Sequence, residues 1–160
     1  MAVIKIVKGN LLDATEDIIA HQVNCMGVMG AGVAKQIKEN YPKAFEMYKR
    51  ACDMCKKYPS WNYGTCQLVI CQKQTGENKL IANLFGQFDY GRERRAYTSE
   101  SQFTCALTDL CDQAHDVYAT SIAMPYKIGC GLAGGNWENI YKIIEGTLSD
   151  FDVTLYKLED

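Results

Sequence analysis

The chain has 160 residues, of which 48% are hydrophobic and 22% charged, and its formal net charge is −2. This length suffices for a substantial core, so we expect a single soluble domain spanning residues 1–160. The small net charge gives no indication of broad electrostatic binding to nucleic acid, and the apolar runs are too short to span a membrane. Because residues 1–8 begin a strand and lack a signal-peptide pattern, we expect a cytoplasmic location.

Apolar, β-branched runs alternate with segments whose apolar residues recur at three- and four-residue steps. The first pattern predicts strands and the second predicts helices. In chain order we expect strand 3–7, strand 18–23, helix 33–40, a helix opened by Pro42, strands 65–71 and 80–85, helix 103–114, strand 119–124, helix 140–148 and strand 153–158. Ser99, with Gln102 three residues later, and Asn136 have the form of helix caps. No linker or repeat interrupts the alternation, which predicts one α/β domain with a sheet between helical layers.

Eight cysteines are present, and without a secretory signal we expect them to be reduced thiols. Four of them lie in apolar patterns and are predicted to be core or near-core residues: Cys66, Cys71, Cys105 and Cys111. Cys52 and Cys55 have the spacing of metal ligands, but no second pair accompanies them. They also continue an apolar helical face, which favours packing over zinc binding. We therefore predict no metal site and no cofactor.

Two glycine-rich loops each follow a predicted strand and precede a predicted helix. The first is N-C-M-G-V-M-G-A-G-V-A-K at residues 24–35, and the second is I-G-C-G-L-A-G-G at residues 128–135. Unpaired amides in such loops, and in the first turn of the following helix, form anion sites. The alternative is a plain tight turn, and the first loop matches neither the dinucleotide-binding G-x-G-x-x-G nor a P-loop. Because both loops would lie at the carboxyl ends of strands, together they predict a ligand with more than one phosphate.

Four segments in this order resemble one known family. They are G-N-L-L at 9–12, I-A-H-Q-V-N-C-M-G-V-M-G-A-G-V-A at 19–34, Y-P-K-A-F at 41–45 and M-P-Y-K-I-G-C-G-L-A-G-G-N-W-E-N at 124–139. The chain resembles the macro domain family, and within it the branch of ADP-ribose 1″-phosphate phosphatases (Appr-1″-p processing) and terminal ADP-ribose glycohydrolases. The resemblance implies a three-layer α/β/α fold with a mixed central sheet. It also implies that ADP-ribose or a derivative binds in a cleft at the strand ends. We expect the protein to be a monomer.

The resemblance assigns roles to individual residues. Asn10 falls where the family usually has an Asp that accepts a hydrogen bond from the adenine amino group, which an amide oxygen can also do. Asn24 matches the Asn that contacts the distal ribose. The ligand-binding residues implied in this way are Asn10, Leu11, Val23, Asn24, Gly30, Ala31, Gly32, Val33, Phe85, Gly129, Cys130, Gly131, Leu132, Ala133 and Gly134. The aromatic loop 85–97 is expected near the mouth of the cleft, where Phe85, Phe88 or Tyr90 could flank the ligand.

Two positions depart from the glycohydrolases of this branch. Those enzymes use a Lys after the fourth strand and an Asp after G-C-G-L, whereas this chain has Gln87 and Ala133 there. The arginines in the same loop stay protonated and are poor nucleophiles, which argues against a covalent sugar intermediate. His21, by contrast, matches a His of the phosphatase-type members.

We therefore expect catalysis to depend on Asn24 and His21. His21 could position water or move a proton near neutral pH, or it could simply support the loop through a hydrogen bond. The favoured function is hydrolysis of ADP-ribose 1″-phosphate to ADP-ribose and phosphate. The alternatives are a non-catalytic ADP-ribose reader and a hydrolase that removes ADP-ribose from protein or nucleic acid. His115, at a helix end, is expected at the surface.

Overall fold

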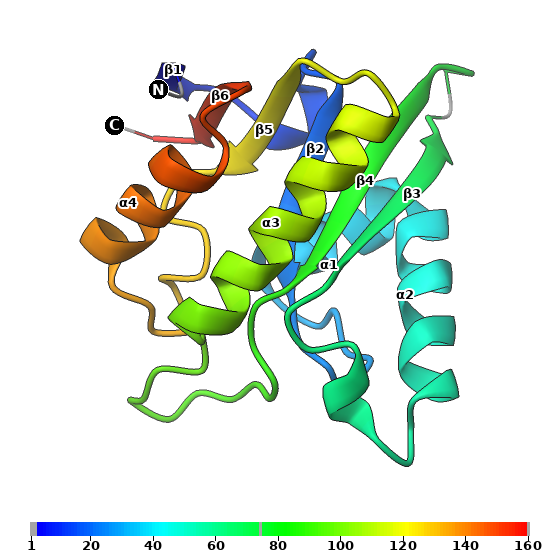
Figure 1. The fold of residues 1–160 in the computed structure, drawn as a ribbon. Coiled ribbons are helices and arrows are strands. Elements are labelled where there is room, and N and C mark those ends of the chain that lie inside the picture. Colours follow the sequence, from blue (N-terminus) through cyan, green and yellow to red (C-terminus); the bar gives the residue numbers. More distant parts are fainter. Residues whose placement is uncertain (1–2, 74, 160) are drawn as a thin grey trace.

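The computed structural model describes residues 3–73 and 75–159 (Figure 1). Within these residues the strands are β1 (Val3–Lys8), β2 (Ile18–Val23), β3 (Cys66–Gln72), β4 (Asn78–Phe85), β5 (Ser121–Pro125) and β6 (Asp152–Lys157). The α-helices are α1 (Gly32–Asn40), α2 (Pro42–Met54), α3 (Glu100–Asp116) and α4 (Trp137–Thr147). Two short 3-10 helices, η1 (Leu11–Asp13) and η2 (Pro59–Trp61), lie in the connections.

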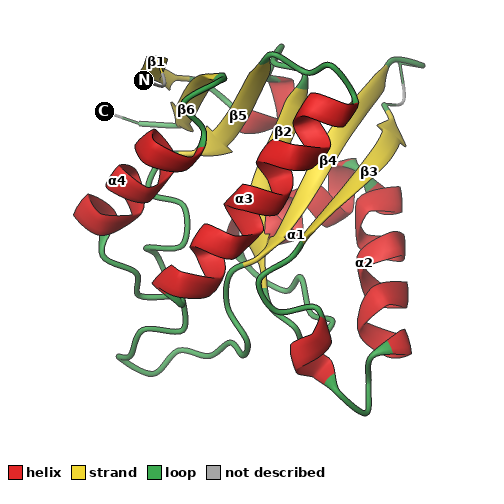
Figure 2. Ribbon diagram, in the orientation of Figure 1, coloured by secondary structure: helices red, strands yellow, loops and turns green. Residues whose placement is uncertain are grey.

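The strands form one mixed sheet in the order β1-β6-β5-β2-β4-β3. Neighbouring strands are parallel except β3 and β4, which form an antiparallel pair. Helices α3 and α4 cover one face of the sheet, and α1 and α2 cover the other (Figure 2). The predicted three-layer α/β/α architecture with a mixed central sheet is therefore confirmed.

Strand β2 shows how the sequence specifies a buried central strand. Ile18 and Ile19 are both fully buried, yet Ile18 packs in the layer of α3 and α4 while Ile19 packs in the layer of α1 and α2. Successive side chains of a strand point to opposite faces, so a strand that is covered on both faces needs a continuous apolar run. This run directs the carboxyl end of β2 into the first glycine-rich loop.

The predicted helix caps are present. Ser99 Oγ accepts a hydrogen bond from the Gln102 amide at 3.2 Å, and Asn136 Oδ1 accepts one from the Asn139 amide at 3.1 Å. Pro42 occupies the first turn of α2, where its missing N–H removes no helical hydrogen bond.

The predicted boundaries differ from the observed ones by up to three residues, and one prediction of burial is wrong. Strand β5 begins at Ser121 instead of residue 119, because the amide of Ala119 donates to the Ala114 carbonyl and closes the end of α3. Cys105 is exposed, because the apolar face of α3 is formed by Phe103, Ala106 and Leu107 and Cys105 points away from it. Cys66 and Cys71 are buried as predicted. None of the helices in residues 3–73 and 75–159 has the length and apolar character needed to cross a membrane.

Candidate functional site

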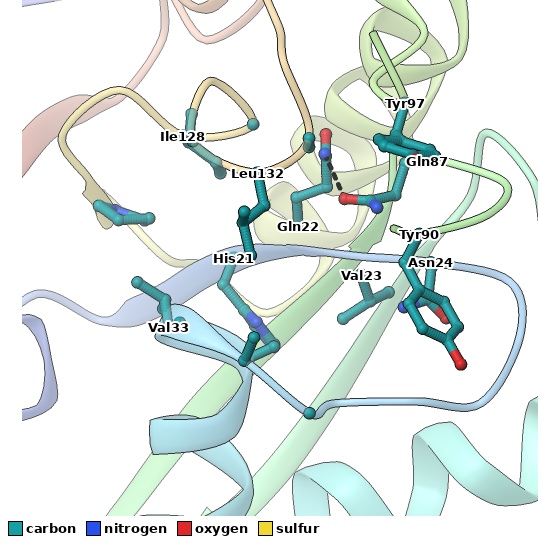
Figure 3. A pocket seen from close by; sticks show the side chains of 18 of the residues that line it. His21, Gln22, Val23, Asn24, Val33, Gln87, Tyr90, Tyr97, Ile128 and Leu132 are labelled. Atoms are coloured by element: carbon teal, nitrogen blue, oxygen red, sulfur yellow. Dashed lines mark hydrogen bonds between the residues drawn. The ribbon is translucent and has the colours of Figure 1, made fainter. Parts of the chain in front are cut away.

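A cavity of about 530 Å³ opens at the carboxyl ends of β2 and β5 (Figure 3). Its wall combines the end of β2, the first glycine-rich loop, loop 86–98 and the second glycine-rich loop. This volume is typical of pockets for small molecules. The structure thus confirms that both glycine-rich loops lie on the same side of the sheet.

The structure brings most of the predicted site residues together in this wall. Those that line it are His21, Val23, Asn24, Gly30, Ala31, Gly32, Val33, Gly129, Gly131, Leu132 and Ala133. In Figure 3, His21 and Val33 lie across the cavity from Leu132 and Ile128 of the second loop. Segments more than one hundred positions apart in the sequence therefore face the same space.

Five predicted ligand-binding residues lie outside this wall. Asn10 is exposed, and its Oδ1 accepts a hydrogen bond from the Leu12 amide at 3.0 Å, so it caps η1. Leu11 packs in the layer of α1 and α2. The ring of Phe85 is buried in the core against Tyr48, so it is not available to a ligand. Cys130 and Gly134 lie in the second loop without lining the cavity.

Several residues of the wall were not predicted from the sequence. Gln22, Val28, Ala34, Gly91, Tyr97 and residues 125–128 line the cavity in addition to those predicted. Tyr90 and Arg92, from the loop that was expected near the mouth, line it as well. Residues 125–128 lie inside the segment 124–139 that carries the family resemblance, so that segment contained the signal. Gln22 likewise lies inside the segment 19–34, whereas no sequence pattern marks Tyr97.

The amides of the two loops form an anion-binding surface. The first amides of helix α1 have no intrahelical partner, and the N-cap residue Ala31 provides no side-chain acceptor for them. Across the cavity, the amides of Gly131, Leu132 and Ala133 make no hydrogen bond to the described part of the chain. A ligand with two phosphates would find free donors on both sides.

Backbone conformations available to glycine shape the second loop. Gly129 and Gly134 have φ values of +74° and +70°. A Cβ on Gly134 would lie 2.5 Å from the Arg95 carbonyl oxygen, and one on Gly135 would lie 2.6 Å from that of Gly129. Glycine tolerates the positive φ and has no Cβ, so the second loop can pack tightly against loop 86–98.

The side chain of Asn24 closes the first loop. Its Nδ2 donates to the Val28 carbonyl at 2.8 Å, and its Oδ1 accepts from the Met26 amide at 2.9 Å. The Tyr48 hydroxyl lies 2.8 Å from this Oδ1 and accepts hydrogen bonds from the amides of Gly27 and Val28. A carboxamide nitrogen has two hydrogens, so one donor of Asn24 remains for a ligand.

His21 is a neutral imidazole in the wall of the cavity, and it donates a hydrogen bond to Asn83. Its Nε2 lies 2.6 Å from Asn83 Oδ1. Asn83 Nδ2 donates to the Ala44 carbonyl and to Gln67 Oε1, so its oxygen must accept the His21 Nε2–H. Burial lowers the pKa of His21 to about 4, which leaves the ring neutral at pH 7. In residues 3–73 and 75–159 nothing donates to His21 Nδ1, so this buried nitrogen is unpaired.

Gln22 connects β2 to loop 86–98 and, through Thr98, to the second glycine-rich loop. Its Nε2 donates to Gln87 Oε1 at 2.8 Å (Figure 3) and to Thr98 Oγ1 at 2.9 Å. Thr98 in turn donates to the Gly129 carbonyl at 2.7 Å. Gln87 Nε2 donates to the Asp89 carbonyl, so Gln87 braces loop 86–98. These bonds fix the wall opposite His21.

The sheet, the paired amide rows and the cavity at the strand ends define an α/β domain built to bind a small anionic ligand. The family model described as the macro domain matches residues 20–144, and the chain belongs to the macro domain family.

Individual relatives agree with this assignment. The chain is 29% identical over 151 residues to the DNA ADP-ribosyl glycohydrolase of Mycobacterium tuberculosis, a match that covers 92% of this chain and 40% of the relative. The chain thus spans about two-fifths of the length of that relative. It is 27% identical over 184 residues to the ADP-ribose 1″-phosphate phosphatase of Saccharomyces cerevisiae, covering 99% of this chain and all of the relative. The macrodomain of Mycobacterium tuberculosis DarG superposes with a TM-score of 0.76 at 27% identity, covering 98% of each chain.

Proposed function

We propose that this macro domain hydrolyses ADP-ribose derivatives and that its substrate is ADP-ribose 1″-phosphate, which it converts to ADP-ribose and phosphate. The observation that carries the proposal is the neutral His21, whose buried Nδ1 has no hydrogen-bond partner among the described residues and which lines a cavity flanked by two rows of free amides. Similarity to the yeast phosphatase over the full length of both chains supports the same activity.

Binding would depend on the two loops. The first amides of α1 and the amides of Gly131, Leu132 and Ala133 would hold the diphosphate between them. The exposed ring of Tyr90 at the mouth would flank the ligand. The cytoplasmic location and the monomeric state are part of this proposal.

The chemistry would consist of orienting water. His21 Nδ1 would accept a hydrogen bond from a water molecule, while the free Asn24 N–H would donate to the terminal ribose or its phosphate. Water then attacks the phosphorus, and the bond between phosphorus and the oxygen on C1″ breaks. That oxygen stays on the ribose and takes up the proton that the attacking water loses. A His with a lowered pKa is a weak base, so positioning and amide electrostatics must supply most of the acceleration. We expect a modest enzyme.

A second candidate function is a reader that binds ADP-ribose without turnover. It is favoured by the Asn24 carboxamide, which already makes four hydrogen bonds, to Met26, to Val28 twice and to Tyr48 of α2. A glycohydrolase acting on ADP-ribosylated nucleic acid or protein, as the name of the mycobacterial relative would suggest, is less compatible with Gln87. That side chain braces its loop and offers no nucleophile.

The decisive experiment measures two quantities on one preparation: phosphate release from ADP-ribose 1″-phosphate and affinity for ADP-ribose. We expect both release and micromolar binding. His21→Ala and Asn24→Ala should each slow release, and unchanged rates in both variants would contradict the assigned roles. Micromolar binding without release would replace the phosphatase by the reader. Release of ADP-ribose from modified DNA or protein, without phosphate release, would indicate the third function.

A further inference from the structure

Three potential metal ligands of different chemistry meet at the end of the molecule opposite the cavity. Cys111 and His115 lie in the last turns of α3, and Asp150 lies between α4 and β6. One ligand atom from each of the three lies within 4.8 Å of those of the other two. His115 Nε2 is 3.1 Å from Asp150 Oδ2.

The arrangement has the geometry of a small chelate. Residues four positions apart on a helix share one face, so Cys111 and His115 point to the same side of α3. The ring of His115 packs against Phe151 with 4.8 Å between centroids, which restricts its orientation. Asp150 completes the group from a separate element. A thiolate, an imidazole and a carboxylate together are a ligand set that Zn²⁺ accepts.

Access and charge favour a cation at this place. His115 and Asp150 are more than half exposed, and Cys111 is partly buried, so an ion can enter from solvent and keep water as a further ligand. The Asp150 carboxylate supplies an anionic ligand within 4.8 Å of the Cys111 sulfur. A divalent ion that binds there would displace the thiol proton.

We propose that Cys111, His115 and Asp150 form a binding site for a borderline divalent cation, of which Zn²⁺ is the representative. The bound ion would link the end of α3 to the turn that precedes β6. In the absence of metal, His115 and Asp150 are hydrogen-bonded at the surface beside the Cys111 thiol.

The proposed site is independent of the ADP-ribose cavity. Asp150 lies just before β6 and the end of α3 leads into β5, so the three ligands lie at the amino ends of these strands (Figure 1). The cavity lies at the carboxyl ends of β2 and β5. Binding of metal should therefore stabilise the fold and leave ligand affinity in the cavity unchanged.

Titration of the metal-free, reduced protein with Co²⁺ tests the proposal, because a thiolate–cobalt bond gives a charge-transfer absorption that Zn²⁺ abolishes by competition. We expect one equivalent to bind. Cys111→Ser and His115→Gln should each weaken binding at least about tenfold, since loss of even outer-shell partners typically has that effect. Cys105→Ser is the matched control, because Cys105 is an exposed thiol on the same helix.

Thermal melting in metal-free buffer checks that each variant is folded. Alkylation followed by mass spectrometry gives a second readout: Zn²⁺ should slow modification of Cys111 and leave the rate at Cys105 unchanged. The proposal is overturned if no thiolate band appears, if Cys111→Ser and His115→Gln bind as the parent does, or if Cys105→Ser abolishes the band. Affinity for ADP-ribose, measured with and without Zn²⁺, separates this result from the fate of the proposed function.

Discussion

His21 Nε2 lies 2.6 Å from Asn83 Oδ1, and this hydrogen bond sets the chemistry that His21 can perform. Both residues are almost completely buried, at 1% and 0% exposure. Asn83 sits on β4 directly beside His21 on β2, and its amide is held by Ala44 and Gln67 from behind. The neutral ring therefore keeps its proton on Nε2 and presents Nδ1 as an acceptor.

Asn83→Leu should release this constraint. The variant leaves the His21 Nε2–H buried without an acceptor, and such a loss typically costs about 1–3 kcal/mol of stability. We expect phosphate release to fall while the ring samples both tautomers, which nitrogen NMR of His21 reports directly. Gln67→Leu is the control, because it removes one partner of Asn83 and leaves the His21–Asn83 bond in place. A single Nε2–H tautomer in Asn83→Leu would show that Asn83 does not position the ring.

The lowered pKa of His21 predicts that stability depends on pH. The pKa of His21 is about 4 in the folded protein and near the usual value of about 6.5 in an unfolded chain. Between these two pH values the unfolded state therefore binds more protons than the folded state. Stability is therefore present above about pH 6.5 and is lost as the pH falls toward 4. From pH 7 to pH 5 the loss is on the order of 2 kcal/mol.

Urea unfolding at pH 7 and pH 5, compared between the parent and His21→Gln, measures this contribution. Gln cannot titrate, so its variant should lose about 2 kcal/mol less than the parent over the same interval. Subtraction removes the carboxyl groups, which titrate in both proteins. Equal losses in the two proteins would mean that His21 is not the group responsible.

The sequence was sufficient for the layers and the loops because those features are local. Each local pattern specifies the conformation of its own segment: a strand at the apolar run 18–23, a turn at the glycines after it, and helix starts at the caps Ser99 and Asn136. The partner of His21 could not be predicted, because an Asn within the apolar strand β4 does not indicate which of its neighbours it faces. Asn83 is 62 positions away, and only the strand register of β2 and β4 brings the two together.

Gln22 and Cys105 illustrate the same limit on side-chain direction. Gln22 lies within the buried strand β2, and it braces the cavity wall through a hydrogen bond to Thr98, which is 76 positions away. Cys105 lies within an apolar stretch of α3, but its exposure depends on which side of the helix the sheet covers. Apolar periodicity identifies the buried face of a helix less reliably where the residues at the edges of that face are small.

Tyr48→Phe should loosen the first loop. The variant removes the oxygen that accepts hydrogen bonds from the amides of Gly27 and Val28 and that lies beside Asn24. We expect a loss of about 1–3 kcal/mol in stability. Affinity for ADP-ribose should fall about tenfold, because the loop that carries free amides loses its support.

Tyr41→Phe is the matched control. Tyr41 is also buried and its hydroxyl donates to the Leu12 carbonyl at 3.0 Å, but it packs away from the cavity in the layer of α1 and α2. This variant should lose stability and retain affinity. Isothermal titration with ADP-ribose compares the two variants, and equal affinities would show that Tyr48 supports the fold alone.

Gly134→Ala should disturb the second loop. The glycine has φ +70°, and an added Cβ would lie 2.5 Å from the Arg95 carbonyl oxygen, so loop 86–98 must move. A strained backbone of this kind costs about 1–3 kcal/mol. The displaced loop also carries Tyr97 and Thr98, whose amides donate to the Ala133 carbonyl, so we expect weaker binding of ADP-ribose as well.

Gly146→Ala provides the opposite case on the same chain. Gly146 lies within α4, and nothing is within 4 Å of the position that its Cβ would take. Alanine in a helix should add about 0.5–1 kcal/mol of stability and leave the cavity unchanged. Urea unfolding and ADP-ribose titration of both variants test the pair. If Gly134→Ala were as stable as the parent and bound ADP-ribose equally well, the second loop would not require glycine at position 134.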